Sequence, residues 1–415
     1  MIGRKFRNIL IITNIAIAMK KKITAFLMSA LTVCVVSAQV VSRNAVAPSE
    51  ESLFERVTQI EKKNDLLNVY LNMNGAFNTS FNQNGVDGLD EGAFKMSQLR
   101  IEAKGQVNSW LSYRWRQRLN RSNYGNEDID NLPTSIDFAA IGIKLGKKFS
   151  IFAGKQCVAY GGIEYDLNPI EIYQYSEMIN NMSNFMTGIT FIYDFTPDQQ
   201  MQFQILNSRN ASQEETYGVG LEKNRLPLVY TLNWNANLFN KVWQTRWSVS
   251  LMDETKDKYM YYLALGNQFN FSKKFDMYFD IMSSFEEVDR KGIMTNMLGG
   301  RDAFGGHNAV GTMYNSLVTK MNYRFKPRWN AFVKGMLESA AMYKTESGVD
   351  KGNYRTSLGY LAGVEFYPIE KSNLHFYCTF IGQSNFFTSR AKSLGLENYS
   401  TQRVALGFIY QLPVF

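Results

Sequence analysis

Histidine, cysteine and proline are scarce in this chain of 415 residues, which holds two His, three Cys and eight Pro. So few His and Cys leave little material for a zinc site or a disulfide scaffold. The low proline content, with no Ser/Pro tract, argues against a mucin-like or largely disordered chain. After residue 38 the chain also lacks any apolar run of about 18 residues, the length that a membrane-spanning helix needs. The mean hydropathy of −0.25 is too polar for a bundle of such helices.

Acidic residues are absent from the first 38 positions, which hold six basic residues. Of the formal net charge of +8, only +2 therefore remains for the rest of the chain. With so small an excess of positive charge beyond this leader, bulk electrostatics gives no support to nucleic-acid binding, and we expect no nucleic-acid partner.

Residues 19–38 have the order of a secretory signal peptide. A basic segment at 19–22 precedes an apolar stretch at 23–36, and Val36, Ser37 and Ala38 form a small-residue cleavage site. The pattern predicts export and cleavage near Ala38, with residues 1–18 as an upstream extension. An uncleaved membrane anchor is the alternative interpretation.

Residues 39–66 are predicted to form an N-terminal periplasmic segment with a short helix. Leu53, Val57, Ile60 and Leu67 recur at helical spacing after acidic residues that suit a first turn. Two heptads are too few to separate an amphipathic helix that packs on the protein from a short coiled coil between protomers.

From about residue 67 the hydrophobic period changes from helical to two. Segment 228–238 shows this most clearly, because Leu232 and Trp234 alternate with Thr231, Asn233 and Asn235. Such alternation predicts sixteen strands, at 67–81, 93–106, 110–121, 135–145, 149–156, 184–195, 201–207, 228–238, 243–252, 259–271, 275–287, 312–325, 329–343, 354–367, 374–388 and 401–415.

Short and long connections alternate between these strands, as between 272–274 and 288–311. An even number of strands with short turns on one side and long loops on the other is typical of bacterial outer-membrane barrels. A soluble β-sandwich also alternates, but its dry core would not accept the many Asn, Gln, Ser and Arg residues on the polar faces. Aromatic residues make up 14% of the chain, as the interface girdles of a membrane barrel require. The sequence therefore predicts an all-β fold, a 16-stranded antiparallel transmembrane β-barrel over 67–415.

Several segments resemble the phosphate-selective porin O and P family. They read Phe-Lys-Met-Ser-Gln-Leu-Arg-Ile-Glu-Ala-Lys-Gly at 94–105, Leu-Ser-Tyr-Arg-Trp-Arg at 111–116, Ile-Asp-Phe-Ala-Ala-Ile-Gly at 136–142 and Phe-Ser-Ile-Phe-Ala-Gly-Lys at 149–155, followed by Glu164. The resemblance implies a trimeric, sixteen-stranded diffusion pore with basic residues along its channel. The chain departs from the family pattern in its last strand, where Gln411 and Pro413 stand at positions expected to be apolar. It also departs after Lys155, where few serines occur.

The faces opposite the apolar ones are predicted to line the lumen and to bind anions. Arg114, Arg116 and Arg118 stand out, because alternate residues of one strand place three cations within roughly 13 Å on one face. They either form an anion track or pair with acids such as Glu102, Asp280, Glu338 or Glu365, and the sequence leaves both open. The full predicted set is Arg100, Lys104, Arg114, Arg116, Arg118, Lys155, Arg246, Lys320, Arg324, Lys334 and Arg355.

The connection at 157–183 is predicted to fold inward and narrow the pore, since Gly161 and Gly162 permit a tight bend. An extracellular flap is the alternative. No Ser-His-acid arrangement or Gly-x-Ser-x-Gly motif occurs. We therefore expect no enzyme activity, no cofactor and no metal.

The sequence predicts an outer-membrane diffusion porin for small hydrophilic solutes, anionic (phosphate-like) ones among them. Its expected partners are outer-membrane lipid, lipopolysaccharide and two further copies of the chain in a homotrimer. A structural or adhesive barrel, whose long loops bind surfaces, is the second hypothesis.

Overall fold

A computed structural model describes residues 65–81, 88–122, 129–345, 349–370 and 372–414. The predicted signal peptide and the predicted helix at 39–66 fall outside the described residues, apart from the last two positions of that segment. No helix in the described part of the chain is long and apolar enough to cross a membrane.

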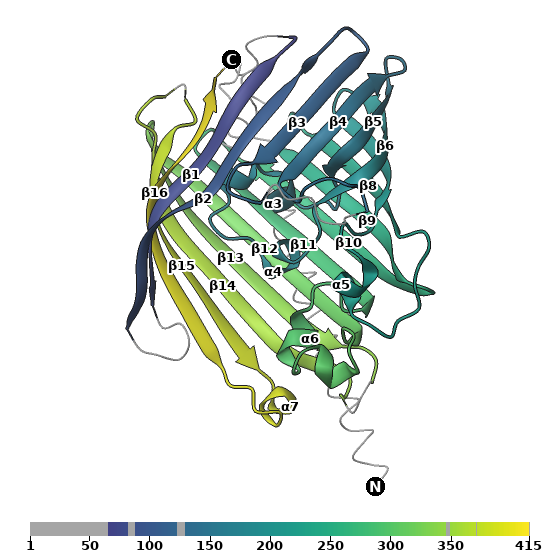
Figure 1. The fold of residues 1–415 in the computed structure, drawn as a ribbon. Coiled ribbons are helices and arrows are strands. Elements are labelled where there is room, and N and C mark those ends of the chain that lie inside the picture. The colour runs from purple at the N-terminus through teal and green to yellow at the C-terminus, as the bar shows by residue number, and fades with distance from the viewer. Residues whose placement is uncertain (1–64, 82–87, 123–128, 346–348, 371, 415) are drawn as a thin grey trace. The chain divides into compact units, whose positions relative to one another are not determined.

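Sixteen antiparallel strands form a closed barrel in the described residues, as predicted. Each strand pairs with its neighbours in sequence, and β1 closes the ring on β16 (Figure 1). The strands are β1 Asn68–Phe81, β2 Leu89–Gln106, β3 Leu111–Arg118, β4 Ile136–Lys144, β5 Phe149–Cys157, β6 Phe185–Thr196, β7 Gln199–Asn207, β8 Leu228–Leu238, β9 Trp243–Thr255, β10 Lys258–Asn270, β11 Phe275–Val288, β12 Val310–Lys326, β13 Trp329–Met342, β14 Gly352–Phe366, β15 His375–Phe387 and β16 Tyr399–Pro413. Closure satisfies the backbone of every strand edge, which a bilayer requires of a spanning sheet.

Side chains alternate between the two faces of the wall. In β8, Leu232 is 44% exposed on the outer face, whereas Thr231 and Asn233 are buried on the inner face. This is the register that the alternation in sequence predicted. The exposed outer face carries large apolar side chains on most strands, including Ile141, Leu337 and Phe380, as a lipid-facing surface requires.

Short helices lie in the connections. They are α3 Ile163–Asp166, η2 Pro169–Glu171, α4 Glu177–Asn180, α5 Gln213–Tyr217, α6 Ile293–Met297, η3 Arg301–Phe304 and α7 Ser389–Lys392. Figure 1 shows α3 and α4 inside the ring of strands, and α5, α6 and α7 at one end of it. The buried apolar core therefore lies within the barrel, where Tyr160, Ile163 and Ile179 pack with wall residues such as Tyr278 and Met336.

Candidate functional site

The connection between β5 and β6, residues 158–184, folds into the barrel and is called the inner loop here. Its entry bend depends on Gly161 and Gly162, whose φ angles are +73° and +89°. A Cβ atom at Gly161 would lie 2.8 Å from the Arg246 carbonyl oxygen, so the loop approaches the wall more closely than a side chain permits. The prediction that this connection folds inward is confirmed.

Carboxylates of the wall hold the backbone of the inner loop. The Ile163 and Glu164 amides donate to the two oxygens of Asp280 on β11, at 2.7 and 2.8 Å. The Met178 amide donates to Glu338 Oε1 on β13 at 3.1 Å. Charge-assisted bonds of this kind are about twice as strong as neutral ones, so buried wall acids fix the loop at several points.

Basic side chains of the wall hold the acids of the same loop. Lys334 pairs with Glu164, which also accepts the Ser176 hydroxyl. Two further pairs join Arg246 to Asp166 and Arg355 to Glu177. Three residues that were predicted to line the lumen therefore hold the loop in place: Lys334, Arg246 and Arg355.

The middle of the inner loop reaches β1, the strand at which the barrel closes. Asn74 on β1 donates to the Ile170 carbonyl at 2.9 Å. Tyr173 stacks on Phe332 with a centroid distance of 4.9 Å, and its hydroxyl donates to Glu365 at 2.8 Å. The loop thus crosses the interior from β5 to the opposite wall.

A group of charged side chains on β2, β3 and β4 faces the same interior, and we call it the arginine wall. Its members are Arg100, Glu102, Lys104, Arg114, Arg116, Arg118 and Asp137. Asp137 is fully buried and lies 3.4, 3.1 and 2.8 Å from nitrogens of Arg100, Arg116 and Arg118. Arg114 Nε donates to Glu102 at 2.8 Å. Two carboxylates therefore meet five cations, and the group keeps an excess of positive charge.

A β-bulge brings Asp137 into this group. Arg116 pairs with Phe138 and Gln117 with Ile136, so Asp137 is the extra residue of β4 and loses the regular alternation. Strict alternation would place Asp137 on the opposite face from Phe138. Alternation in the sequence does not predict this acid at the site, because no residue pattern marks a bulge here.

Two phenylalanine rings support the guanidinium groups. The Arg114 and Arg116 guanidinium carbons lie 3.8 and 4.7 Å from the centre of the Phe138 ring. Arg116 and Arg118 each lie 5.4 Å from the Phe185 ring. Cation–π contacts fix the direction of each side chain without neutralising its charge. Arg100 and Arg116 are buried, whereas the side chains of Arg114 and Arg118 stay 32% and 17% exposed.

The remaining predicted residues lie elsewhere. Lys320 and Arg324 of β12 lie over the rings of Phe332 and Tyr367, at 4.8 and 5.9 Å. Lys155 does not join the arginine wall. It shares its strand face with Ala153, whose partner Ile141 is exposed on the outside, and it pairs at 3.0 Å with Asp130.

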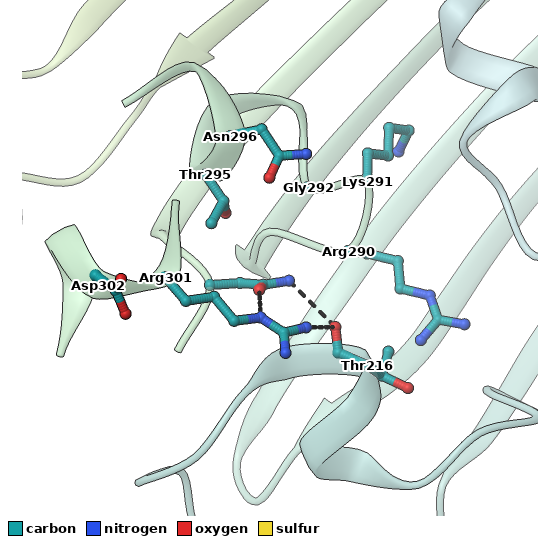
Figure 2. Close-up of a pocket in the computed structure, with 9 residues that line it drawn as sticks. Thr216, Arg290, Lys291, Gly292, Thr295, Asn296, Arg301 and Asp302 are labelled. Atoms are coloured by element: carbon teal, nitrogen blue, oxygen red, sulfur yellow. Dashed lines mark hydrogen bonds between the residues drawn. The ribbon is translucent and has the colours of Figure 1, made fainter. Parts of the chain in front are cut away.

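A cavity of about 540 Å³ lies between the long connections at one end of the barrel (Figure 2). Arg290, Lys291 and Arg301 line it, but their charged groups are already bound. Lys291 pairs with Glu286, Arg290 donates to Tyr217, and Arg301 donates to carbonyls at 214–216. The three cations therefore stabilise the connections that surround the cavity.

Asp289 stabilises the loop beside this cavity. Its carboxylate accepts the Thr295 amide and hydroxyl and the Tyr314 hydroxyl, at 2.7–2.8 Å. Burial raises the pKa of Asp289 to about 6, and nearby Glu286 acts in the same direction. In the described part of the chain, no three His, Cys, Asp or Glu side chains come together as metal ligands.

A closed sixteen-stranded barrel with an inner loop and a charged interior defines the class of outer-membrane porins. Within that class, the chain belongs to the phosphate-selective porin O and P family, whose sequence model matches residues 68–412. A comparison with curated protein sequences gives no match.

Solved structures show the same fold at low sequence identity. The outer-membrane channel DcaP of Acinetobacter baumannii has a TM-score of 0.57 at 10% identity, covering 85% of this chain and 99% of that one. An anion-selective porin from Comamonas acidovorans has a TM-score of 0.54 at 10% identity, with coverages of 83% and 99%. OmpF of Salmonella typhi has a TM-score of 0.53 at 13% identity, with coverages of 83% and 97%.

Proposed function

We propose that this outer-membrane porin lets small hydrophilic solutes diffuse through its lumen and favours anions, with the arginine wall as the selective surface. The observation that carries the proposal is the division of charge inside the barrel. The bonds of the inner loop described above go to β1, β9, β11, β13 and β14, and on β9, β13 and β14 basic residues of the wall pair with acids of the loop. The arginine wall on β2 and β3 keeps five cations against two carboxylates.

Fixed positive charge raises the local concentration of anions and lowers their entry barrier, and low-dielectric walls strengthen this effect. Ion pairing and anion attraction, the two alternatives for Arg114, Arg116 and Arg118, are compatible in this geometry. Pairing with Glu102 and Asp137 orders the side chains, while the unmatched charge acts on passing ions. Lys104 supports the same surface, since it lies 5.5 Å from the Tyr70 ring and near Glu102.

The double variant Arg114→Gln/Arg118→Gln tests the selective role. It leaves Arg100 and Arg116 on Asp137, and Lys104 near Glu102, so neither carboxylate is stranded. In planar bilayers under a KCl gradient, its reversal potential should move towards cation preference, and the shift should shrink in molar salt, where the screening length is about 3 Å.

The matched control is Lys223→Gln/Arg225→Gln, which removes two exposed cations from the long connection between β7 and β8. It should leave the reversal potential unchanged. Equal shifts in both variants would reject the arginine wall as the selective surface. A barrel that does not conduct at all would favour the structural or adhesive alternative.

The family resemblance extends the proposal to a homotrimer, and the pattern at 19–38 extends it to export with cleavage near Ala38. Mass measurement of the purified protein in detergent tests the trimer, and N-terminal sequencing of the mature chain tests the cleavage site. A monomeric mass, or a mature chain that begins before residue 39, would reject the respective extension.

A further inference from the structure

Three turns at the short-turn end of the barrel carry a concentration of exposed positive charge, which we call the basic rim. The turns are 239–242, 271–274 and 326–328, and they contain no acidic residue. The exposed cations of the basic rim are Lys241, Lys273, Lys274, Lys326 and Arg328.

These turns form one continuous edge of the sheet. The Asn270 amide donates to the Val242 carbonyl at 2.9 Å, and the Arg324 amide donates to the Lys274 carbonyl at 2.7 Å. Neighbouring strands lie about 4.8 Å apart, so the three turns span roughly 20 Å. Arg328 lies 3.6 Å from Glu370, which offsets part of its charge. The other four cations of the rim are lysines.

An aromatic belt lies next to the basic rim. Phe239, Trp243 and Phe269 stack in sequence, with centroid distances of 6.4 and 6.1 Å. Other members of the belt are Phe271, Phe275, Tyr323, Phe325 and Trp329. Asn267 lies on the outer face, and its side-chain oxygen accepts hydrogen bonds from the Trp243 and Trp247 indoles at 3.1 and 3.3 Å. The polar side chain of Asn267 is therefore hydrogen-bonded within the belt.

We infer that the basic rim binds the anionic headgroups of phospholipids in the leaflet at the short-turn end. Transmembrane barrels carry girdles of aromatic residues at both membrane interfaces, which places the adjoining lysines among the headgroup phosphates. Basic residues near such a surface attract anionic lipid. The inference rests on the membrane insertion of the barrel and is independent of the selectivity of its pore.

The arrangement suits a lipid surface better than a single dissolved anion. The cations are exposed and spread along roughly 20 Å of one edge, and they do not converge on one enclosed point. A row of headgroups presents charge in the same linear form, whereas one phosphate ion would meet a single turn.

Spin-labelled lipids provide the test. The purified barrel is reconstituted in phosphatidylcholine vesicles with a trace of spin-labelled phosphatidylglycerol or phosphatidylcholine, and electron paramagnetic resonance measures the fraction of each lipid held at the protein surface. The rim variant carries Lys241→Gln, Lys273→Gln, Lys274→Gln and Lys326→Gln. The control variant carries four matched changes in long connections, Lys223→Gln, Arg225→Gln, Lys351→Gln and Lys392→Gln.

The wild type should prefer phosphatidylglycerol by roughly fivefold, the factor expected for one basic side chain near a headgroup. The rim variant should lose most of this preference and the control should keep it. Equal binding of the two lipids by the wild type, or an equal loss in the control, would overturn the inference. Displacement of phosphatidylglycerol by inorganic phosphate, but not by chloride at the same ionic strength, would also overturn it in favour of a free-phosphate site.

Chloride conductance and the mobility of the unheated barrel on gels serve as folding controls for both variants. If the rim variant does not fold, the pair Lys273→Gln/Lys274→Gln should still lower the preference for phosphatidylglycerol, and an unchanged preference in that pair would refute the inference. A variant that conducts like the wild type but has lost its lipid preference separates this inference from the proposed pore function, which would stand unchanged.

Discussion

Replacing Asp137 by Asn would change the stability and the selectivity of the barrel in opposite senses. The side chain is fully buried and lies within 3.4 Å of nitrogens from three arginines. Asn keeps the shape and one acceptor oxygen but removes the charge that holds Arg100, Arg116 and Arg118 together. Breaking a buried ion pair from one side costs about 3–5 kcal/mol, because the partner charges stay buried and uncompensated.

The same change would remove one of the two carboxylates that oppose five cations in the arginine wall. If the barrel still closes, Asp137→Asn should therefore increase anion preference, although the protein becomes less stable. Asp198→Asn is a matched control, because Asp198 is an exposed acid in the short turn between β6 and β7.

Two assays on the same preparation separate these effects. The denaturant concentration that unfolds the barrel, followed by its mobility on unheated gels, should fall for Asp137→Asn and stay constant for Asp198→Asn. The reversal potential in a KCl gradient should move further towards anion preference for Asp137→Asn alone. Unchanged stability together with an unchanged reversal potential would refute the role given to Asp137.

Three further predictions follow from the register, the inner loop and the turns. Leu232→Arg should impair assembly by roughly 2–4 kcal/mol near the midplane, whereas Asn233→Arg on the inner face should be mild; equal yields of heat-stable barrel would show that the register is wrong. Gly161→Val should loosen the inner loop, because the φ angle of Gly161 is +73° and the space that a side chain would need is filled by the barrel wall. Single-channel traces of this variant should show larger current fluctuations than those of the wild type; quiet traces would contradict the close packing at this bend. Long loops of outer-membrane barrels face outward and short turns face the periplasm, so on intact cells a cysteine at Asp302 should react with an impermeant maleimide and one at Lys273 should not; the reverse pattern would contradict this orientation.

Local alternation was sufficient to predict the strands, because each strand of a membrane barrel must present one face to lipid and the other to the interior. Leu232 on the outer face and Asn233 on the inner face show that neighbouring residues of one strand follow this constraint. Gly161 and Gly162 likewise marked the bend of the inner loop, since few other residues adopt its φ angles.

The partners of the charged residues were not predictable in the same way. Lys334 meets Glu164 and Arg355 meets Glu177 only because the inner loop crosses the barrel, and each pair is more than 150 positions apart in sequence. Asp137 enters the arginine wall through a bulge that alternation does not encode. The sequence thus indicated which residues are inside, while the three-dimensional fold determines which of them remain available to solutes.

The reversal potential of single wild-type channels in a tenfold KCl gradient tests the central claim most directly. If the excess charge of the arginine wall controls permeation, the potential at zero current should have the sign of chloride preference, and its magnitude should fall as both solutions are raised towards molar salt. A potential of zero, or one with the sign of potassium preference, would contradict the account, because the basic side chains of Arg100, Arg114, Arg116 and Arg118 would then be structural only.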